Sequence, residues 1–219
     1  MATFVLIHGA ADVGWYWHLV AAELRAHGHD VVAPDLPCDD DTAGLAEYAD
    51  TVVEAIGERT DLVVVGQSFA GFIAPLVAVR CPTRLIVLVA AMIPAPGESP
   101  ADWWANTGYR PAADGPRDVY HDVPPDLAAE ARRRGRGQSE ARMDEPWPLS
   151  AWPEVPTRFV LCTADSVFPP GFLRRVVADR LGIVPDEIEA GHCVALSRPT
   201  ELAALLEGYL AAQLPRRGA

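Results

Sequence analysis

Cysteines are few in this sequence, and no two of them are closely spaced. The four are Cys38, Cys81, Cys162 and Cys193, so the chain has no Cys-x-x-Cys motif. This spacing excludes a zinc knuckle and gives no sign of a disulfide framework. Separate thiols are typical of a protein in a reducing compartment, and we therefore expect a cytoplasmic location.

Long hydrophobic runs are also missing. The apolar run at residues 4–7 follows no basic residue and stops at His8, which does not match a secretory signal peptide. The run at residues 85–92 is far too short to cross a bilayer. We therefore expect no membrane association.

Positive charge is scarce relative to negative charge. The chain has 18 Lys and Arg against 30 Asp and Glu, a net charge of −12. Such an acidic surface repels phosphate backbones and anionic lipids, so a nucleic-acid partner is not expected. Half of the 219 residues are hydrophobic, and the 20 prolines and 17 glycines are scattered. This composition indicates one globular domain, residues 1–219.

Predicted strands alternate with predicted helices along most of the chain. Because strands separated by helices pair in parallel with right-handed crossovers, we predict an α/β fold. Its mainly parallel sheet would have about six strands, with helices on both faces. The expected strands are 3–8, 29–33, 62–65, 84–90, 158–162 and 184–189, and the expected helices are 15–27, 43–58, 69–80, 171–181 and 200–214.

The alternation stops between residues 94 and 156. This segment is rich in Pro, Trp, Gly and charged residues, and only 126–132 has a helical pattern. A structureless loop of this length is uncommon in a compact domain. We therefore interpret 94–156 as a small, partly helical cap inserted between the fourth and fifth strands. The basic run at 132–136 is interpreted as a solvated helix end.

Ser68 lies in the stretch Gly-Gln-Ser-Phe-Ala-Gly, between a predicted strand and a predicted helix. A sharp strand-to-helix turn needs small neighbours, which Gly66, Ala70 and Gly71 supply. Such a turn projects the serine hydroxyl at the carboxyl end of the sheet, where ligands of open α/β folds bind. We expect Ser68 to be a nucleophile. The alternative is a serine that only caps the following helix.

A serine hydroxyl needs an adjacent base to attack at neutral pH. Among the six histidines, His192 is the candidate because it follows the last predicted strand. It therefore lies at the same end of the sheet as Ser68. Asp165 follows the fifth predicted strand and can fix the tautomer of the imidazole. A plain turn aspartate is the alternative for Asp165.

The loop after the first predicted strand is expected to supply an oxyanion hole. A developing oxyanion needs backbone N–H donors beside Ser68. We nominate the amides of Ala10 and Phe69, with Gly9 allowing a close backbone approach. His8 is expected to order this loop by hydrogen bonding, and Asp12 to be solvated.

Together these motifs resemble the α/β-hydrolase superfamily, in the branch with plant methylesterases and hydroxynitrile lyases. The resemblance runs through Phe-Val-Leu-Ile-His-Gly-Ala at 4–10, Gly-Trp-Tyr-Trp at 14–17 and the segment 28–37. It continues in the segments around Ser68, Asp165 and His192, which follow the family's chain order. The resemblance implies that these three form a catalytic triad, with oxyanion donors at Ala10 and Phe69. The implied chemistry requires no cofactor and no metal.

Two departures narrow the expected chemistry. Hydroxynitrile lyases of this branch have a threonine where Gly9 stands and a lysine where Cys193 stands, which argues against cyanohydrin cleavage. Relatives that are haloalkane dehalogenases or epoxide hydrolases have an aspartate where Ser68 stands, so their covalent chemistry is excluded.

Aromatic residues are concentrated in or beside the predicted cap. They can line an apolar pocket over Ser68 or hold the cap against the core, and the sequence does not decide between these roles. The expected pocket residues are Gly9, Trp103, Trp104, Tyr109 and Trp147.

We predict a serine esterase that cleaves a small or medium hydrophobic carboxylic ester through an acyl-enzyme intermediate. The expected partner is that small-molecule ester, and a homodimer is left open. One alternative is a thioesterase, a carbon–carbon hydrolase or a cyclase that uses the same triad on a biosynthetic intermediate. The other is a non-catalytic small-molecule receptor on the same fold.

Overall fold

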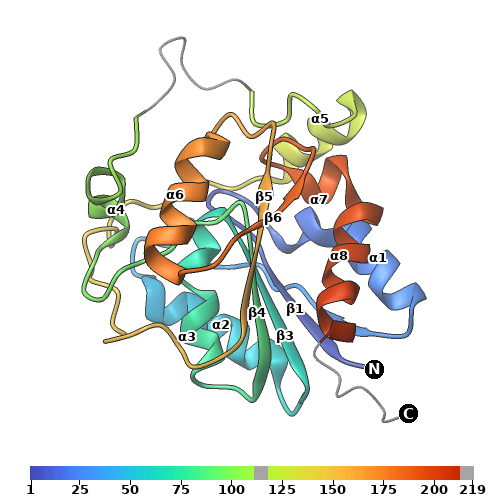
Figure 1. Cartoon of the computed structure of the whole chain (residues 1–219), viewed down its shortest axis with the longest axis horizontal. Coiled ribbons are helices and arrows are strands. Elements are labelled where there is room, and N and C mark those ends of the chain that lie inside the picture. Colours follow the sequence, from blue (N-terminus) through green and yellow to red (C-terminus); the bar gives the residue numbers. More distant parts are fainter. Residues whose placement is uncertain (111–117, 213–219) are drawn as a thin grey trace.

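A parallel sheet forms the centre of the computed structural model, which describes residues 1–110 and 118–212 (Figure 1). Its six strands lie in the order β2-β1-β3-β4-β5-β6. Each predicted strand is present, with ends that differ by one or two residues. The predicted α/β fold class is therefore confirmed. The strands are β1 (Thr3–Ile7), β2 (Asp30–Val32), β3 (Leu62–Gln67), β4 (Thr83–Val89), β5 (Thr157–Cys162) and β6 (Asp186–Ile188).

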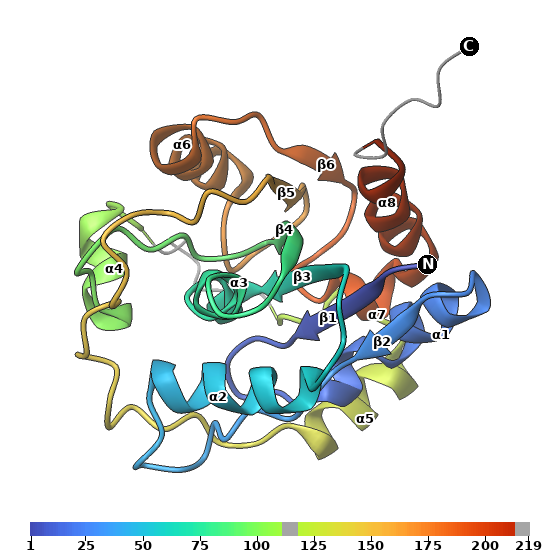
Figure 2. The ribbon, with the colours of Figure 1, turned by 90° about the horizontal axis from the view of Figure 1, so that it is seen from below.

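Helices cover both faces of the sheet (Figure 2). Alternate strand residues face opposite layers: Val64 packs with α2, α3 and α6, whereas Val63 and Val65 pack with α1, α7 and α8. Burial on both faces explains why the central strands are almost continuously apolar. The helices are α1 (His18–Ala26), α2 (Leu45–Ile56), α3 (Ala74–Ala78), α6 (Pro170–Leu181), α7 (Val194–Ser197) and α8 (Pro199–Ala212).

Two predicted helices begin as 3₁₀ turns. The helix predicted at 15–27 starts with η1 (Gly14–Trp17) before α1. The helix predicted at 69–80 consists of η2 (Ser68–Gly71) followed by the short α3. The start of the second helix is irregular because of the turn that precedes it. In this turn Ser68 has a φ of +53°, and Gly71 packs against the backbone of Met92. A residue in this left-handed conformation cannot form part of a right-handed α-helix itself, so the regular helix begins after the turn.

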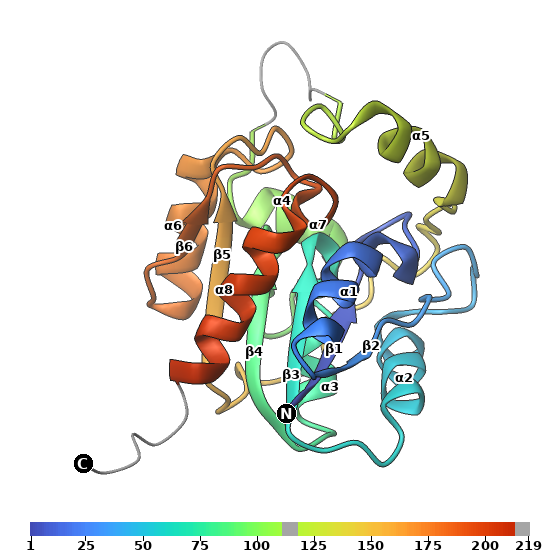
Figure 3. The same ribbon diagram turned by 90° about the vertical axis from the view of Figure 1, so that its right-hand side faces the viewer.

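Within the described part of the segment between β4 and β5 lie two helices, α4 (Pro100–Asn106) and α5 (Pro125–Arg134). The second confirms the helix predicted at 126–132. Figure 3 shows α5 next to α1, beyond the carboxyl end of the strands. Glu98 is buried in this segment and forms an ion pair with Arg180 of α6, which ties the segment to the core.

The basic run at 132–136, which begins in the last turn of α5, is exposed, but its guanidinium groups are paired. Arg133 and Arg134 both bind Glu130, and Arg136 binds the exposed Asp35, in the loop after β2, at 2.9 Å. Arg134 also lies 5.0 Å from the ring centroid of Trp15. The run is thus the exposed basic end of α5, as expected, and the contacts of Arg134 with Trp15 and of Arg136 with Asp35 link it to neighbouring segments.

We predict that Gly71→Ala is destabilising. A Cβ at this position would come within 1.7 Å of the Met92 carbonyl oxygen, so η2 and the end of β4 must separate. The expected loss is at least about 1–3 kcal/mol in the free energy of unfolding, measured by urea denaturation. The control is Gly208→Ala in α8, where the space is open. This control should gain about 0.5–1 kcal/mol through helix propensity. Equal stability of the two variants would contradict this account.

Candidate active site

Ser68 lies at the turn where β3 ends and η2 begins. Its φ of +53° is a left-handed conformation that costs a non-glycine residue about 1–3 kcal/mol. The neighbouring backbone is crowded: a Cβ at Gly66 would lie 2.8 Å from the Ala70 carbonyl oxygen. A Cβ at Gly9 would lie 3.0 Å from the Ser68 Cβ. The small residues around Ser68 are therefore required by space as well as by the turn.

The structure brings Ser68, His192 and Asp165 into one chain of hydrogen bonds. His192 lies between β6 and α7, and its Nε2 is 3.0 Å from the Ser68 hydroxyl. Its Nδ1 is 2.8 Å from Oδ2 of Asp165, which follows β5. As a carboxylate, Asp165 can only accept, so Nδ1 donates and Nε2 is left to accept from the serine. This arrangement suits a base that removes the proton of Ser68.

Asp165 is held in place by the loop that carries it. Its Oδ1 accepts hydrogen bonds from the backbone N–H groups of Val167, at 2.7 Å, and Phe168, at 3.0 Å. The side chains of Asp165 and His192 are both buried, so bulk water competes little for their hydrogen bond. Three loops at the carboxyl end of the sheet thus supply these groups.

His8 orders the loop after β1. It is fully buried, its Nδ1 donates to the Gly9 carbonyl oxygen at 2.8 Å, and its Nε2 accepts from the Leu36 N–H at 3.0 Å. Burial lowers the pKa of His8, which keeps the ring neutral. The loop therefore presents Ala10 on one side of Ser68, with Phe69 following the serine directly. Both residues line the same cavity.

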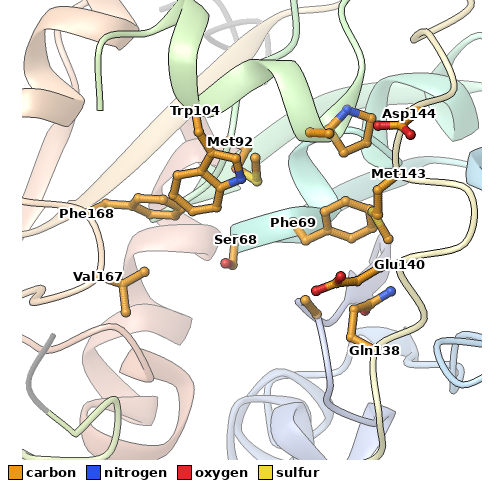
Figure 4. A pocket seen from close by; sticks show the side chains of 13 residues that line it. Ser68, Phe69, Met92, Trp104, Gln138, Glu140, Met143, Asp144, Val167 and Phe168 are labelled. Carbon is orange, nitrogen blue, oxygen red and sulfur yellow. The ribbon is translucent and has the colours of Figure 1, made fainter. Parts of the chain in front are cut away.

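That cavity has a volume of about 620 Å³ and opens above Ser68. In Figure 4, Trp104, Met92 and Phe168 lie on one side of the serine, and Phe69 and Met143 lie on the other. Glu140 and Gln138 face the cavity from a third direction. The lining residues are Ala10, Ser68, Phe69, Met92, Pro100, Ala101, Trp104, Gln138, Glu140, Met143, Asp144, Val167 and Phe168.

Of the side chains expected to line a pocket, Trp104 lies on this wall and the others do not. Trp103 and Trp147 are buried, and their indole N–H groups donate to the carbonyl oxygens of Ile93 and Phe72. They hold the inserted segment against the core, which was the other role open to them.

Tyr109 and Gly9 also lie outside the wall. The hydroxyl of Tyr109 donates to the Val167 carbonyl oxygen at 2.9 Å, and Gly9 packs against Gln67 and Ser68. Tyr109 therefore supports the loop behind Phe168, and Gly9 provides space beside the serine.

Sequence reasoning missed Gln67, the buried residue before Ser68. Its side-chain amide donates to the His192 carbonyl oxygen at 3.3 Å and lies 3.2 Å from the ring Nε2. Gln67 is part of the sequence motif around Ser68, but the motif and the strand pattern do not predict which residue its side chain contacts. Its contact with the distant residue 192 is a property of the fold.

Asp12 is half-buried, which contradicts the expected solvated side chain. Its Oδ1 accepts from the Val13 N–H at 2.8 Å. Burial raises the pKa of Asp12 to about 6, and the nearby Asp35 adds to this shift. Ionisation of this carboxylate at neutral pH therefore lowers the stability of the folded chain.

Residues 1–110 and 118–212 show neither a cluster of metal ligands nor a membrane-spanning helix. No three His, Cys, Asp or Glu side chains in these ranges converge as a metal site would require. None of the helices described there combines the length and the apolar character needed to cross a lipid bilayer.

Comparison with known proteins gives matches over most of the chain. The profile of the alpha/beta hydrolase family matches residues 4–205. Norfluorocurarine synthase 1 from Strychnos sp is 24% identical over 250 residues, which cover 93% of this chain and 93% of the relative. Methylesterase 7 from Arabidopsis thaliana is 35% identical over 111 residues, but this match covers 45% of the chain and 43% of the relative.

A solved structure shares the fold. Polyneuridine aldehyde esterase superposes with a TM-score of 0.82 over 96% of this chain and 99% of that one, at 20% sequence identity. At this identity, the likeness establishes the architecture.

We predict that Asp12→Asn stabilises the protein at neutral pH. The pKa of Asp12 is higher in the folded chain than its ordinary value of 3.8, so ionisation destabilises the fold as pH rises from about 4 to 6. Asparagine keeps the acceptor for Val13 and carries no charge. The expected gain at pH 7.5 is about 1–2 kcal/mol, after allowance for partial solvent access.

The measurement is urea denaturation at pH 7.5 and at pH 3.5. The gain should largely disappear at the lower pH, where the aspartate is mostly protonated in both states. A gain of the same size at both values would show that charge burial is not its cause.

Proposed function

The chain belongs to the alpha/beta hydrolase family, and from this we propose that it is a serine esterase acting on small or medium hydrophobic carboxylic esters. The observation that carries the proposal is the chain of hydrogen bonds from Asp165 through His192 to Ser68, at the floor of an apolar cavity. Relatives named methylesterase and polyneuridine aldehyde esterase support ester hydrolysis.

In the proposed reaction, His192 Nε2 takes the proton of Ser68 while the serine oxygen attacks the ester carbonyl carbon. The resulting oxyanion is held by the N–H groups of Ala10 and Phe69. Collapse of this intermediate breaks the bond to the alcohol, which leaves with the proton from His192. Water then attacks the acyl-enzyme with the same base, and the acid and Ser68 are released. Asp165 keeps the imidazole in the required tautomer and stabilises its charged form.

We propose that residues 94–156 form the cap of this single domain. The part of the segment that the structure describes supplies Pro100, Ala101 and Trp104 from α4, and Gln138, Glu140 and Met143 after α5, to the cavity wall. A cavity of about 620 Å³ is of the size that encloses a drug-sized molecule, which supports a substrate of small or medium size.

The charge of the lining favours neutral or cationic esters over esters that carry a carboxylate. Glu140 and Asp144 are the charged residues among those that line the cavity, and both are acidic. The aromatic rings of Trp104 and Phe168 face the same space and can accommodate an apolar or cationic group.

The name of one relative supports a reaction other than ester hydrolysis at the same site. Norfluorocurarine synthase 1 matches along nearly the whole chain, and its name describes a synthase. The same triad used by a thioesterase, a carbon–carbon hydrolase or a cyclase therefore stays a candidate. The cytoplasmic location and the homodimer stay predictions.

We predict that Ser68→Ala lowers the rate of p-nitrophenyl butyrate hydrolysis by about 10³-fold or more, because the attacking oxygen is removed. The rate is measured at saturating ester, and a fluorophosphonate probe is used to test covalent labelling. The control is Ser150→Ala, an exposed serine outside the cavity lining, which should keep full activity and full labelling.

Equal turnover by the wild type and Ser68→Ala would overturn the assignment of the nucleophile. Tight ligand binding by a wild-type protein that neither turns over esters nor reacts with the probe would favour a receptor.

We predict that removal of the acidic charges in the cavity relaxes its selectivity. Wild-type protein should prefer p-nitrophenyl valerate over p-nitrophenyl hydrogen glutarate, which carries a carboxylate at the end of a similar acyl chain. The double variant Glu140→Gln/Asp144→Asn should raise kcat/KM for the glutarate ester about 2- to 10-fold, since both carboxylates are exposed and screened. The rate with valerate should change less than about twofold.

The control is Glu54→Gln/Glu58→Gln, which makes the same change of net charge at exposed positions outside the lining. The difference between the esters should shrink at high salt. Identical responses of both double variants would show that net charge, and not the cavity wall, governs selectivity.

A further inference from the structure

The loop that carries His192 is held by a side chain from the inserted segment. The Gly191 N–H donates to Oδ2 of Asp122 at 2.6 Å, across 69 positions of sequence. Asp122 lies shortly before α5. A hydrogen bond from a backbone amide to a carboxylate is about twice as strong as one between neutral groups. It therefore fixes the peptide unit directly before the histidine.

Gly191 fits closely against Asp122. A Cβ at position 191 would lie 2.5 Å from Oδ1 of Asp122 and 2.7 Å from Cε1 of His121. Only a residue without a side chain allows this approach. A glycine is therefore required before His192, because it leaves space for the Asp122 carboxylate.

The other oxygen of the Asp122 carboxylate, Oδ1, lacks a hydrogen bond among the described residues. This oxygen is also buried. A buried carboxylate oxygen without a partner costs stability. The hydrogen bond from Gly191 to Oδ2 is therefore the interaction that accounts for a carboxylate at this position.

Two other contacts hold the loop from the core. The Ala164 N–H donates to the Ala190 carbonyl oxygen at 3.0 Å, and the Gln67 amide donates to the His192 carbonyl oxygen at 3.3 Å. Asp122 restrains the peptide between these two points. The backbone on both sides of the imidazole is therefore restrained, by the core at residues 190 and 192 and by the inserted segment at residue 191.

We propose that Asp122 is a positioning residue for His192, which couples the inserted segment to the geometry of the base. This rests on the proposed function, in which His192 takes the proton of Ser68 over a distance of 3.0 Å. Without the carboxylate, the Gly191 N–H loses its acceptor and the loop can shift. Displacement of a catalytic group by about 1 Å can cost 10²-fold in rate.

The test compares Asp122→Ala, Asp122→Asn and Asp126→Ala with the wild type, using p-nitrophenyl butyrate. We expect Asp122→Ala to lower kcat about 10- to 100-fold with KM within about twofold, because the cavity does not include this residue. Asp122→Asn keeps an oxygen that can accept from Gly191, so its kcat should recover to within about threefold of the wild type. Asp126→Ala, at an exposed position in α5, is the matched control and should behave as the wild type.

The rate of phosphonylation of Ser68 provides a second readout, since it depends on the same base and needs no turnover. It should fall in parallel with kcat in Asp122→Ala. Tm is measured for each variant, and a loss of Tm without a change in kcat would leave Asp122 with a purely structural role and overturn the proposal.

If Asp122→Ala does not fold, Gly191→Ala decides. The added Cβ displaces the carboxylate, so kcat should fall by a similar factor while KM holds; an unchanged kcat would overturn the proposal. Wild-type activity that is lost in Ser68→Ala but retained in both Asp122→Ala and Gly191→Ala would reject the positioning role and leave the proposed function intact. Absence of ester turnover in the wild type would reject the proposed function itself.

Discussion

The hydrogen bond between Ser68 and His192 depends on the parallel arrangement of the sheet. Each side chain follows a different strand, and Asp165 follows a third. Because all strands run the same way, their carboxyl ends meet at one edge, and residues far apart in sequence come within 3 Å. If any of these three strands ran in the opposite direction, the loop after it would lie at the other end of the sheet. The apolar strands that bury both faces of the sheet are therefore the precondition of the polar site above it.

The inserted segment divides its residues between two tasks. Trp103, Trp147 and Glu98 face inward and anchor the segment through buried hydrogen bonds and an ion pair. Trp104 and Glu140 face the cavity. Neighbouring residues in the sequence thus serve different purposes, as Trp103 and Trp104 show most directly.

This division explains why the sequence predicted the strands and the three site residues but not the cavity wall. The strands were predictable because runs such as Val63–Val65 are apolar and β-branched, and the positions of Ser68, Asp165 and His192 followed from where the strands end. The cavity wall was not predictable, because residues 138–144 have no periodicity and their direction is decided by packing against distant elements. The half-buried state of Asp12 was not predicted for the same reason, since an aspartate in a loop carries no local signal of burial.

The place of Trp104 has a spectroscopic consequence. Trp104 is 39% exposed on the cavity wall, whereas Trp17, Trp103 and Trp147 are almost wholly shielded from solvent, and the partly buried Trp15 and Trp152 do not line the cavity. An ester or inhibitor that enters the cavity removes water from the Trp104 ring, and the emission of that ring shifts toward shorter wavelength while the tryptophans outside the cavity wall stay constant. Intrinsic fluorescence of the unlabelled protein can therefore report occupancy directly, including for compounds that are bound but not cleaved.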